Sequence, residues 1–196
     1  MTLEGKVALV TGASRGIGAA VARALDEQGV KLGLASRSGD DLGLDAVARP
    51  CDVRELLELE SIVAATVERY GRLDILVANA GVGAYGPFLD LSREHLDEMI
   101  DVNLRGTIYA VRAALPHLVE SGQADLVTIA SEAGRRGLPF EATYCASKFG
   151  QVGFTRALDG ELRQHGIRCT NVCPGGVATD FALGEGRGRS QDVLPG

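Results

Sequence analysis

The sequence is poor in the residues on which metal centres and disulfide-linked domains depend. It has no tryptophan, three histidines and four cysteines among 196 residues. Four scattered cysteines do not form the framework of a small secreted domain. Cys169 and Cys173 are four residues apart, but no second pair of histidines or cysteines completes a zinc site. We therefore expect free, buried thiols and no metal ion.

Membrane and nucleic-acid partners are also disfavoured. No apolar run reaches the length of about 18 residues that a membrane-spanning helix needs. The start of the chain, residues 1–6, lacks the basic and apolar parts of a secretory signal. The 26 acidic residues outnumber the 20 lysines and arginines, and the resulting net charge of −6 argues against nucleic-acid binding. We expect a cytoplasmic protein with no membrane and no nucleic-acid partner.

Glycine is abundant instead, with 26 residues that lie singly near the ends of apolar segments. These segments alternate with stretches of helical periodicity, which is typical of parallel strands joined by helical crossovers. The length and the lack of a linker predict one domain over residues 1–196. We predict a single doubly wound, Rossmann-like α/β domain with helices on both faces of a six-stranded parallel sheet. The expected strands are 6–10, 31–35, 46–48 leading into 51–53, 73–77, 125–129 and 167–172, and the expected helices are 19–29, 54–70, 92–120 and 143–164.

A glycine-rich turn follows the first expected strand. Gly12, Gly16 and Gly18 open the first helix, where free N–H groups and the helix dipole favour a pyrophosphate group. In a doubly wound sheet, ligands bind at the carboxyl ends of the strands, which is where this turn lies. The alternative is that the glycines serve only the turn.

The end of the second strand distinguishes between nicotinamide cofactors. An NAD site usually has a carboxylate here to hold the ribose 2′-hydroxyl, but this chain has Ser36 and Arg37 and no carboxylate before Asp40. A guanidinium suits a phosphate group, and Arg15 could add a second positive charge. We therefore favour NADP(H) over NAD(H). The alternative is that both arginines are solvated surface residues.

Three residues suggest acid–base chemistry on a carbonyl group. Tyr144 and Lys148 lie four residues apart at the start of a helix and so share one face. We expect the lysine ammonium to lower the pKa of the tyrosine. Ser131 follows the fifth strand, where its hydroxyl could bond a carbonyl oxygen. Taken alone, such a Tyr–Lys pair is more often plain surface structure.

The order of these motifs resembles that of the short-chain dehydrogenase/reductase family over residues 3–181. The matching positions are Thr11, Gly12, Gly16, Ile17, Gly18, Asp52, Val53, Asn79, Ala80, Gly81, Asn103, Ser131, Tyr144, Lys148, Pro174 and Gly175. The resemblance implies that Tyr144 is the catalytic acid or base and that Ser131 holds the substrate oxygen. It implies that Lys148 binds the nicotinamide ribose, and that Asn103 anchors a water in the proton relay to this lysine.

The resemblance also implies the contacts to the cofactor. Asp52 and Val53 would lie against the adenine, and residues 79–81 along the cofactor. The loop after the last strand would hold the nicotinamide carboxamide. With the first turn and the second strand, the expected cofactor-binding residues are Gly12, Ser14, Arg15, Gly16, Ile17, Gly18, Arg37, Asp52, Val53, Asn79, Ala80, Gly81, Tyr144, Lys148, Pro174, Gly175, Val177 and Thr179.

The chain departs from the family pattern in two places. Only 14 residues separate Arg37 from Asp52, so the helix between the second and third strands is expected to be a turn, to be lost, or to be missing from the sequence. The family also usually continues beyond Gly196 into a seventh strand. A natural short member, a truncated chain and omitted disordered parts are all compatible with this end. We expect residues 182–196 to form a mobile part of the substrate loop.

Two functions are compatible with these features. The first is an NADP(H)-dependent carbonyl reductase or alcohol dehydrogenase of broad type, a 3-oxoacyl thioester reductase included. The second is a cofactor-binding protein with little turnover that acts as a regulatory or interaction partner. The expected substrate pocket is lined from residues 83–88, 132–144 and the segment after Thr179. The resemblance further implies a homodimer or homotetramer formed through helices 92–119 and 143–164.

Overall fold

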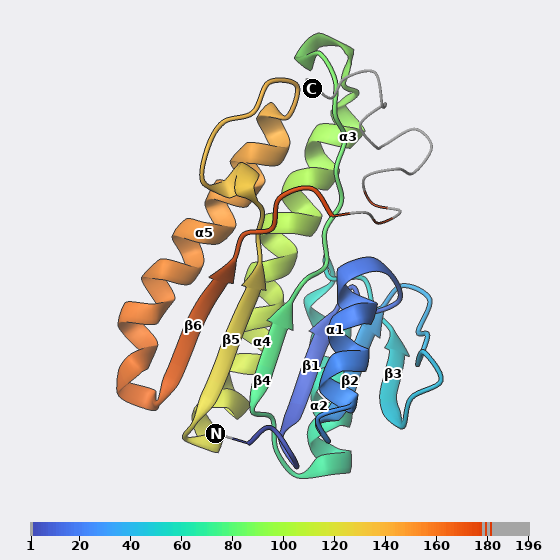
Figure 1. The fold of residues 1–196 in the computed structure, drawn as a ribbon, viewed down its shortest axis with the longest axis vertical. Helices are drawn as coiled ribbons and strands as arrows, with labels where there is room; N and C mark the ends of the chain where they lie inside the picture. The colour runs from blue at the N-terminus through green and yellow to red at the C-terminus, as the bar shows by residue number, and fades with distance from the viewer. Residues whose placement is uncertain (1, 178, 180, 182–196) are drawn as a thin grey trace.

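The described chain folds around one six-stranded sheet. The computed structural model describes residues 2–177, 179 and 181. Its strands are β1 (Val7–Thr11), β2 (Lys31–Ser36), β3 (Ala46–Pro50), β4 (Ile75–Ala78), β5 (Ala124–Ile129) and β6 (Ile167–Val172). They pair in the order β3-β2-β1-β4-β5-β6, and every pairing is parallel (Figure 1). The prediction of a doubly wound parallel sheet is confirmed.

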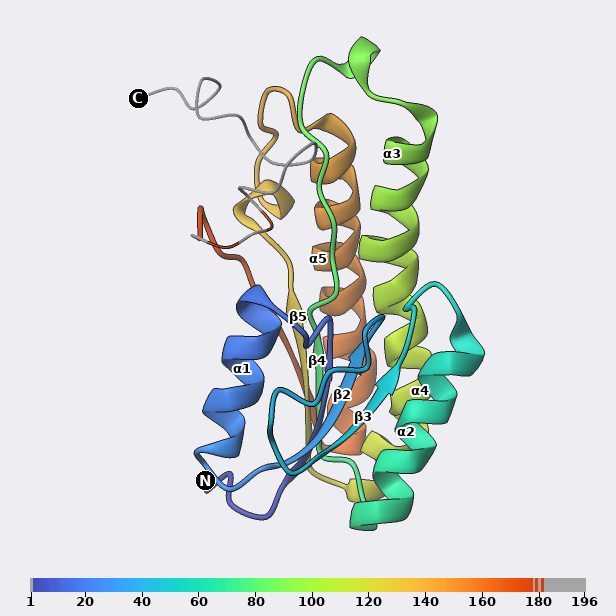
Figure 2. The same ribbon diagram turned by 90° about the vertical axis from the view of Figure 1, so that its right-hand side faces the viewer.

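Helices cover both faces of the sheet, as predicted. Helix α1 (Gly16–Asp26) lies on one face, and α2 (Leu56–Tyr70), α4 (Gly106–Ser121) and α5 (Ala142–Leu162) lie on the other (Figure 2). Side chains alternate between the faces along each strand. In β1, Leu9 therefore joins the core beneath α2 and α4, whereas Val10 joins the core beneath α1.

The strand order places a crevice at the carboxyl end of the sheet. Chain connections run from β1 outward through β2 to β3, and then return to β4 on the other side of β1. Loops that leave β1 and β4 consequently diverge to opposite faces. In open α/β sheets this divergence forms the ligand crevice. The turn at Gly12 and the segment after Ala78 border it.

The connection between β2 and β3 contains no helix among the described residues. Residues 37–45 form turns, in which Asp40 accepts a hydrogen bond from the Leu42 N–H at 2.8 Å. Leu42 and Leu44 pack against the core beneath α1 and so take over part of the role of a crossover helix. Of the alternatives expected for this connection, the structure shows a turn in place of the helix.

The predicted helical stretch over residues 92–120 is confirmed, but it is not a uniform α-helix. The segment divides into α3 (Arg93–Glu98), a π-helical stretch η2 (Met99–Arg105) and α4. Asn103 lies in the π-helical stretch, where its side chain bonds the backbone of Val82 through both of its polar atoms, at 2.8 and 2.9 Å. The wider π turn accompanies this tertiary contact, and such turns often occur at functional sites. The expected mobile segment 182–196 lies outside the described residues.

Candidate active site

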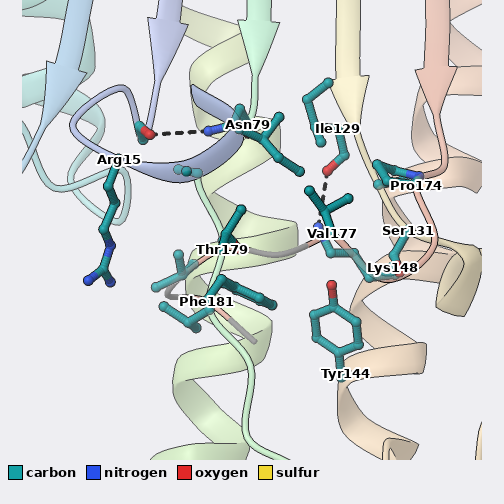
Figure 3. Close-up of a pocket in the computed structure, with 18 of the residues that line it drawn as sticks. Arg15, Asn79, Ile129, Ser131, Tyr144, Lys148, Pro174, Val177, Thr179 and Phe181 are labelled. Atoms are coloured by element: carbon teal, nitrogen blue, oxygen red, sulfur yellow. Dashed lines mark hydrogen bonds between the residues drawn. The ribbon is translucent and has the colours of Figure 1, made fainter. Parts of the chain in front are cut away.

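A cavity of about 500 Å³ opens at the carboxyl ends of the strands. It extends from the β1 and β2 turns to the start of α5, and the segment after β6 borders it (Figure 3). The predicted site residues that line it are Gly12, Ser14, Arg15, Gly16, Ile17, Arg37, Asp52, Val53, Asn79, Ala80, Gly81, Ser131, Tyr144, Lys148, Pro174, Gly175, Val177 and Thr179. The fold thus brings together residues up to 167 positions apart in the sequence (Gly12 to Thr179). Gly18 and Asn103 are not among the lining residues.

The first turn is held by close backbone contacts. Gly12 has φ of +64°, and a Cβ on it would lie 2.8 Å from Cα of Ala80. A Cβ on Gly18 would lie 2.2 Å from the carbonyl oxygen of Gly12. Gly18 therefore permits the packing of α1 against the turn instead of facing the cavity. Asn79 fastens this turn to β4, because its Nδ2 donates to the Thr11 and Gly12 carbonyls at 2.9 and 3.2 Å.

The start of α1 is available to an anion. Arg15 precedes the helix, and its side chain makes no capping hydrogen bond. The first N–H groups of a helix lack partners within the helix, so they can donate to a phosphate. Arg15 itself is exposed at the border of the cavity (Figure 3).

The far end of the cavity carries positive charge and hydroxyl groups. Ser36, Arg37 and Ser38 line it at the end of β2, with Arg37 exposed. Asp52 lies nearby and accepts two hydrogen bonds of 3.0 Å from Nε of Arg54. These hydrogen bonds lower the pKa of Asp52, and the charge of Arg37 adds to the effect. The pairing of Asp52 with Arg54 did not follow from the sequence motif, although the two residues are only two positions apart.

Ser131, Tyr144 and Lys148 meet at the other end of the cavity. Ser131 caps a short 3₁₀ turn and accepts a hydrogen bond from the Ala133 N–H at 3.1 Å. Tyr144 and Lys148 are one turn apart on α5, and both side chains are buried. The Lys148 Nζ lies 5.7 Å from the centre of the Tyr144 ring and donates to the Ile129 carbonyl at 3.1 Å. The Tyr144 hydroxyl points into the cavity (Figure 3).

The pKa of Tyr144 differs in direction from the expectation. Burial raises it, and the hydrogen-bonding hydroxyls of Ser131 and Tyr85 only partly oppose this effect. The Glu141 carboxylate raises it further. The expected lowering of the Tyr144 pKa is wrong, because burial of the phenol outweighs the groups that oppose it. Burial also lowers the pKa of Lys148, to about 7. The lysine is therefore only partly charged at neutral pH.

Asn103 lies behind the cavity rather than on its wall. Its side chain is fully buried and also donates to Oγ of Ser147 at 3.0 Å. Its backbone carbonyl accepts hydrogen bonds from Thr107 and Gln151 at 2.7 and 2.8 Å. These contacts join the π-helical stretch to α5 on either side of Lys148. The role of Asn103 in a proton relay stays a prediction.

The segment after β6 borders the cavity as expected. The Pro174 carbonyl accepts a hydrogen bond from the Glu132 N–H at 2.8 Å, which fixes the segment beside Ser131. Thr179 reaches the first turn, since a Cβ on Gly16 would lie 3.5 Å from its Cβ. Described residues of this segment therefore border the cavity both beside Ser131 and beside the first turn.

Two buried or partly buried cavity residues were not singled out in the sequence. Tyr85 lies in the loop after β4, and Glu141 lies immediately before α5. Both fall within segments expected to line a substrate pocket. Their contacts with Tyr144 depend on the folding of distant loops against each other, so no local pattern could assign either residue a role.

Neither a metal cluster nor a membrane-spanning helix occurs among the residues that the structure describes. Within residues 2–177, 179 and 181, histidine, cysteine, aspartate and glutamate form no group of three or more suited to a metal ion. In the same part of the chain, every helix is too short or too polar to cross a bilayer.

Comparisons with known proteins agree on one family. The family described as short chain dehydrogenase matches residues 6–188. Oxidoreductase UcpA of Salmonella typhimurium is 40% identical over 190 residues, covering 92% of this chain and 72% of the relative. D-threitol dehydrogenase of Mycolicibacterium smegmatis is 35% identical over 203 residues, with 98% and 78% covered. The 3-ketoacyl-(acyl-carrier-protein) reductase of Brucella melitensis, solved with NADH, superposes with a TM-score of 0.87 at 31% identity, covering 91% of this chain and 79% of that chain.

Proposed function

This chain belongs to the short chain dehydrogenase family, and we propose that it is an NADP(H)-dependent oxidoreductase. The proposed reaction is reversible hydride transfer between the cofactor and the carbon of a ketone or secondary alcohol. One observation carries the proposal: Ser131, Tyr144 and Lys148 converge at one end of a cavity whose other end is formed by the first turn and Arg37. Relatives that act as dehydrogenases and reductases support an enzyme of alcohol and carbonyl groups.

The cavity residues fit a nicotinamide dinucleotide. The turn at Gly12 approaches Ala80 so closely that a side chain would fill the space, and the start of α1 can donate to a pyrophosphate. Asp52 and Val53 would hold the adenine, and Pro174, Gly175, Val177 and Thr179 the nicotinamide end. When bound, the nicotinamide supplies or accepts the hydride.

The side chains of the chain itself would manage the proton and the substrate oxygen. Because burial raises the pKa of Tyr144, its phenol is protonated at neutral pH and suits the role of acid in carbonyl reduction. Ser131 would donate a hydrogen bond to the substrate oxygen that Tyr144 protonates. Lys148 would bind ribose hydroxyls and relay protons, with Asn103 behind it. The reverse reaction needs the phenolate and is expected to increase with pH.

Turnover is tested with the Tyr144→Phe variant. Removal of the phenolic proton is expected to lower kcat by roughly 10²- to 10⁴-fold, with binding of the reduced cofactor nearly unchanged. The assay is oxidation of NADPH with a panel of simple ketones and diketones. Tyr70→Phe is the matched control, since the Tyr70 hydroxyl contacts the Asp45 carbonyl away from the cavity. Cofactor binding without turnover in the wild type would favour a regulatory role over an enzyme.

We also propose self-association through α4 and α5. Ile108 on α4 and Phe149 on α5 leave 37% and 46% of their surface exposed, and the two helices lie side by side (Figure 1). Burial of such side chains between copies is favourable. The change Phe149→Glu is expected to shift the sedimentation of the protein from dimer or tetramer toward monomer. A wild type that sediments as a monomer would contradict this proposal.

A further inference from the structure

Tyr85 is the second tyrosine of the active-site cavity. It lies in the loop after β4 and lines the cavity next to Tyr144. The centres of the two rings are 5.4 Å apart, and the ring planes meet at 75°. This edge-on arrangement is a favourable one for aromatic pairs. The Tyr85 hydroxyl is also a hydrogen-bond partner of the Tyr144 hydroxyl, so the pair makes a polar contact as well as an apolar one.

The loop holds Tyr85 in this position by two backbone features. A Cβ on Gly83 would lie 2.7 Å from the Tyr85 hydroxyl oxygen and 2.8 Å from Cζ. The Tyr85 ring end therefore rests over a residue that has no side chain. The Gly86 N–H donates to the Phe140 carbonyl at 3.0 Å, which ties the loop to the segment that leads into α5. Tyr85 thus approaches Tyr144 because two distant segments are joined.

The groups around the Tyr144 hydroxyl act on its charge in opposite ways. From α5 and the residue before it come Glu141 and Cys145, which disfavour a phenolate, and Lys148, which lies 5.7 Å from the ring. The loop after β5 contributes Ser131, and the loop after β4 contributes Tyr85. Phe181 lies against the ring and is apolar. Among the described residues, the hydroxyl groups of Ser131 and Tyr85 are therefore the neutral hydrogen-bond donors that face the Tyr144 oxygen.

We propose that Tyr85 is a positioning residue for Tyr144: its hydroxyl donates a hydrogen bond to the Tyr144 oxygen and sets the pH range in which Tyr144 exchanges a proton with the substrate. This inference rests on the proposed oxidoreductase function. A hydrogen bond to a charged oxygen is roughly twice as strong as one to a neutral oxygen. The contact with Tyr85 therefore stabilises the phenolate more than the phenol. It also fixes the ring orientation of Tyr144 before the substrate binds.

The first test is the pH profile of kcat/KM for alcohol oxidation in the Tyr85→Phe variant. This change keeps the ring and removes only the hydroxyl. The rising limb is expected to move up by about 0.5 to 1 pH unit. Below the limb, kcat/KM then falls by about 3- to 10-fold, and the difference narrows as the pH enters the limb. An unchanged kcat/KM below the limb, or a loss that stays undiminished through the limb, would overturn the inference.

A second variant tests whether the position of the Tyr85 hydroxyl matters as well as its presence. Gly83→Ala would displace the ring end of Tyr85 and is expected to move the limb in the same direction as Tyr85→Phe. Tyr70→Phe, at a tyrosine whose hydroxyl contacts Asp45, should leave the limb in place. If the rising limb of Gly83→Ala coincides with that of Tyr70→Phe instead of that of Tyr85→Phe, the result would contradict the proposed contact between Tyr85 and Tyr144.

A spectroscopic measurement distinguishes failure of this inference from failure of the proposed function. The ultraviolet absorbance of phenolate is titrated in the wild type and in Tyr144→Phe, and the difference reports the ionisation of Tyr144. The same difference is then taken on the Tyr85→Phe background and is expected to lie at higher pH. A shift without turnover would support the contact while refuting the oxidoreductase function. Turnover without a shift would refute the role of Tyr85 alone.

Discussion

Burial of Lys148 is expected to lower the free energy of unfolding of the protein at neutral pH. Burial lowers the pKa of its ammonium from the usual 10.5 to about 7. Each pKa unit corresponds to about 1.4 kcal/mol. The shift therefore costs the folded state about 4 kcal/mol at pH 7, because the unfolded chain keeps the lysine charged in water.

The variant Lys148→Met removes this cost while preserving an unbranched side chain. The main loss is the hydrogen bond from Nζ to the Ile129 carbonyl, about 1 kcal/mol. We therefore expect a net gain of about 2 to 3 kcal/mol in the free energy of unfolding at pH 7. The same variant should lose nearly all oxidoreductase activity, because the ribose contact and the relay group disappear.

The pH dependence gives a second and sharper criterion. Between the folded pKa near 7 and the unfolded pKa of about 10.4, the unfolded wild type binds one more proton than the folded wild type. Its stability must therefore rise with pH across this window, by linkage. In Lys148→Met this rise disappears, and the two proteins should approach equal stability near pH 10.

Urea unfolding at pH 7, 8 and 9, followed by far-ultraviolet circular dichroism in reducing buffer, measures both effects. The exposed lysine at the start of β2 provides the matched control, Lys31→Met, which is expected to change stability by less than about 0.5 kcal/mol. The slope of the free energy against urea should be unchanged in both variants. A Lys148→Met protein that is less stable than the wild type at pH 7, or that keeps the wild-type rise with pH, would contradict a destabilising effect of Lys148 burial.

Three further changes test the turn, the cofactor preference and the ion pairs of the buried Asp74 carboxylate. Gly18→Ala places a Cβ against the Gly12 carbonyl and should lower the free energy of unfolding in urea by about 2 to 4 kcal/mol. The control is Gly160→Ala, where a Cβ meets nothing within 4 Å; this variant should be more stable than the wild type by up to about 1 kcal/mol. Arg37→Glu should weaken NADPH binding by roughly 10- to 100-fold, the contribution of one charge-assisted hydrogen bond to phosphate, and should leave NADH binding nearly unchanged. The fluorescence of the nucleotide reports the binding of both cofactors, because the chain has no tryptophan. Equal losses of affinity for the two nucleotides would show that Arg37 does not bind a phosphate. Burial raises the pKa of Asp74, but hydrogen bonds from Arg72, Val7 and Lys6 lower it more, so its stabilisation is present above the usual carboxyl pKa and is lost as the pH falls through the lowered one. Because Lys6 and Arg72 stay accessible to water, Asp74→Asn should cost about 2 kcal/mol at pH 7 and much less at pH 3 in acid-titrated urea unfolding. An equal cost at both pH values would contradict the ion-pair explanation.

Much of the fold could be predicted because its causes are local. Apolar runs such as Val7–Val10 can be satisfied only by burial on both faces of a sheet, which requires parallel strands with helical covers. The four-residue spacing of Tyr144 and Lys148 places them on one helix face wherever the helix lies. Ser131, Gly12 and Arg37 follow strand ends, and parallel strands bring such ends to one edge. The short interval before Asp52 likewise limited the β2–β3 connection to turns.

Other features were decided only by tertiary structure, because they depend on contacts between segments that are distant in the sequence. The helical pattern of residues 92–120 does not reveal the π turn, since that turn accompanies the contact of Asn103 with the backbone of Val82. The direction of the Tyr144 and Lys148 pKa shifts follows from the depth of their burial, which a helical periodicity does not measure. Tyr85 meets Tyr144 because Gly86 is bonded to Phe140. Local patterns along the chain specify which residues lie at the edge of the sheet, whereas the packing of the loops sets how far the charges of those residues are removed from water.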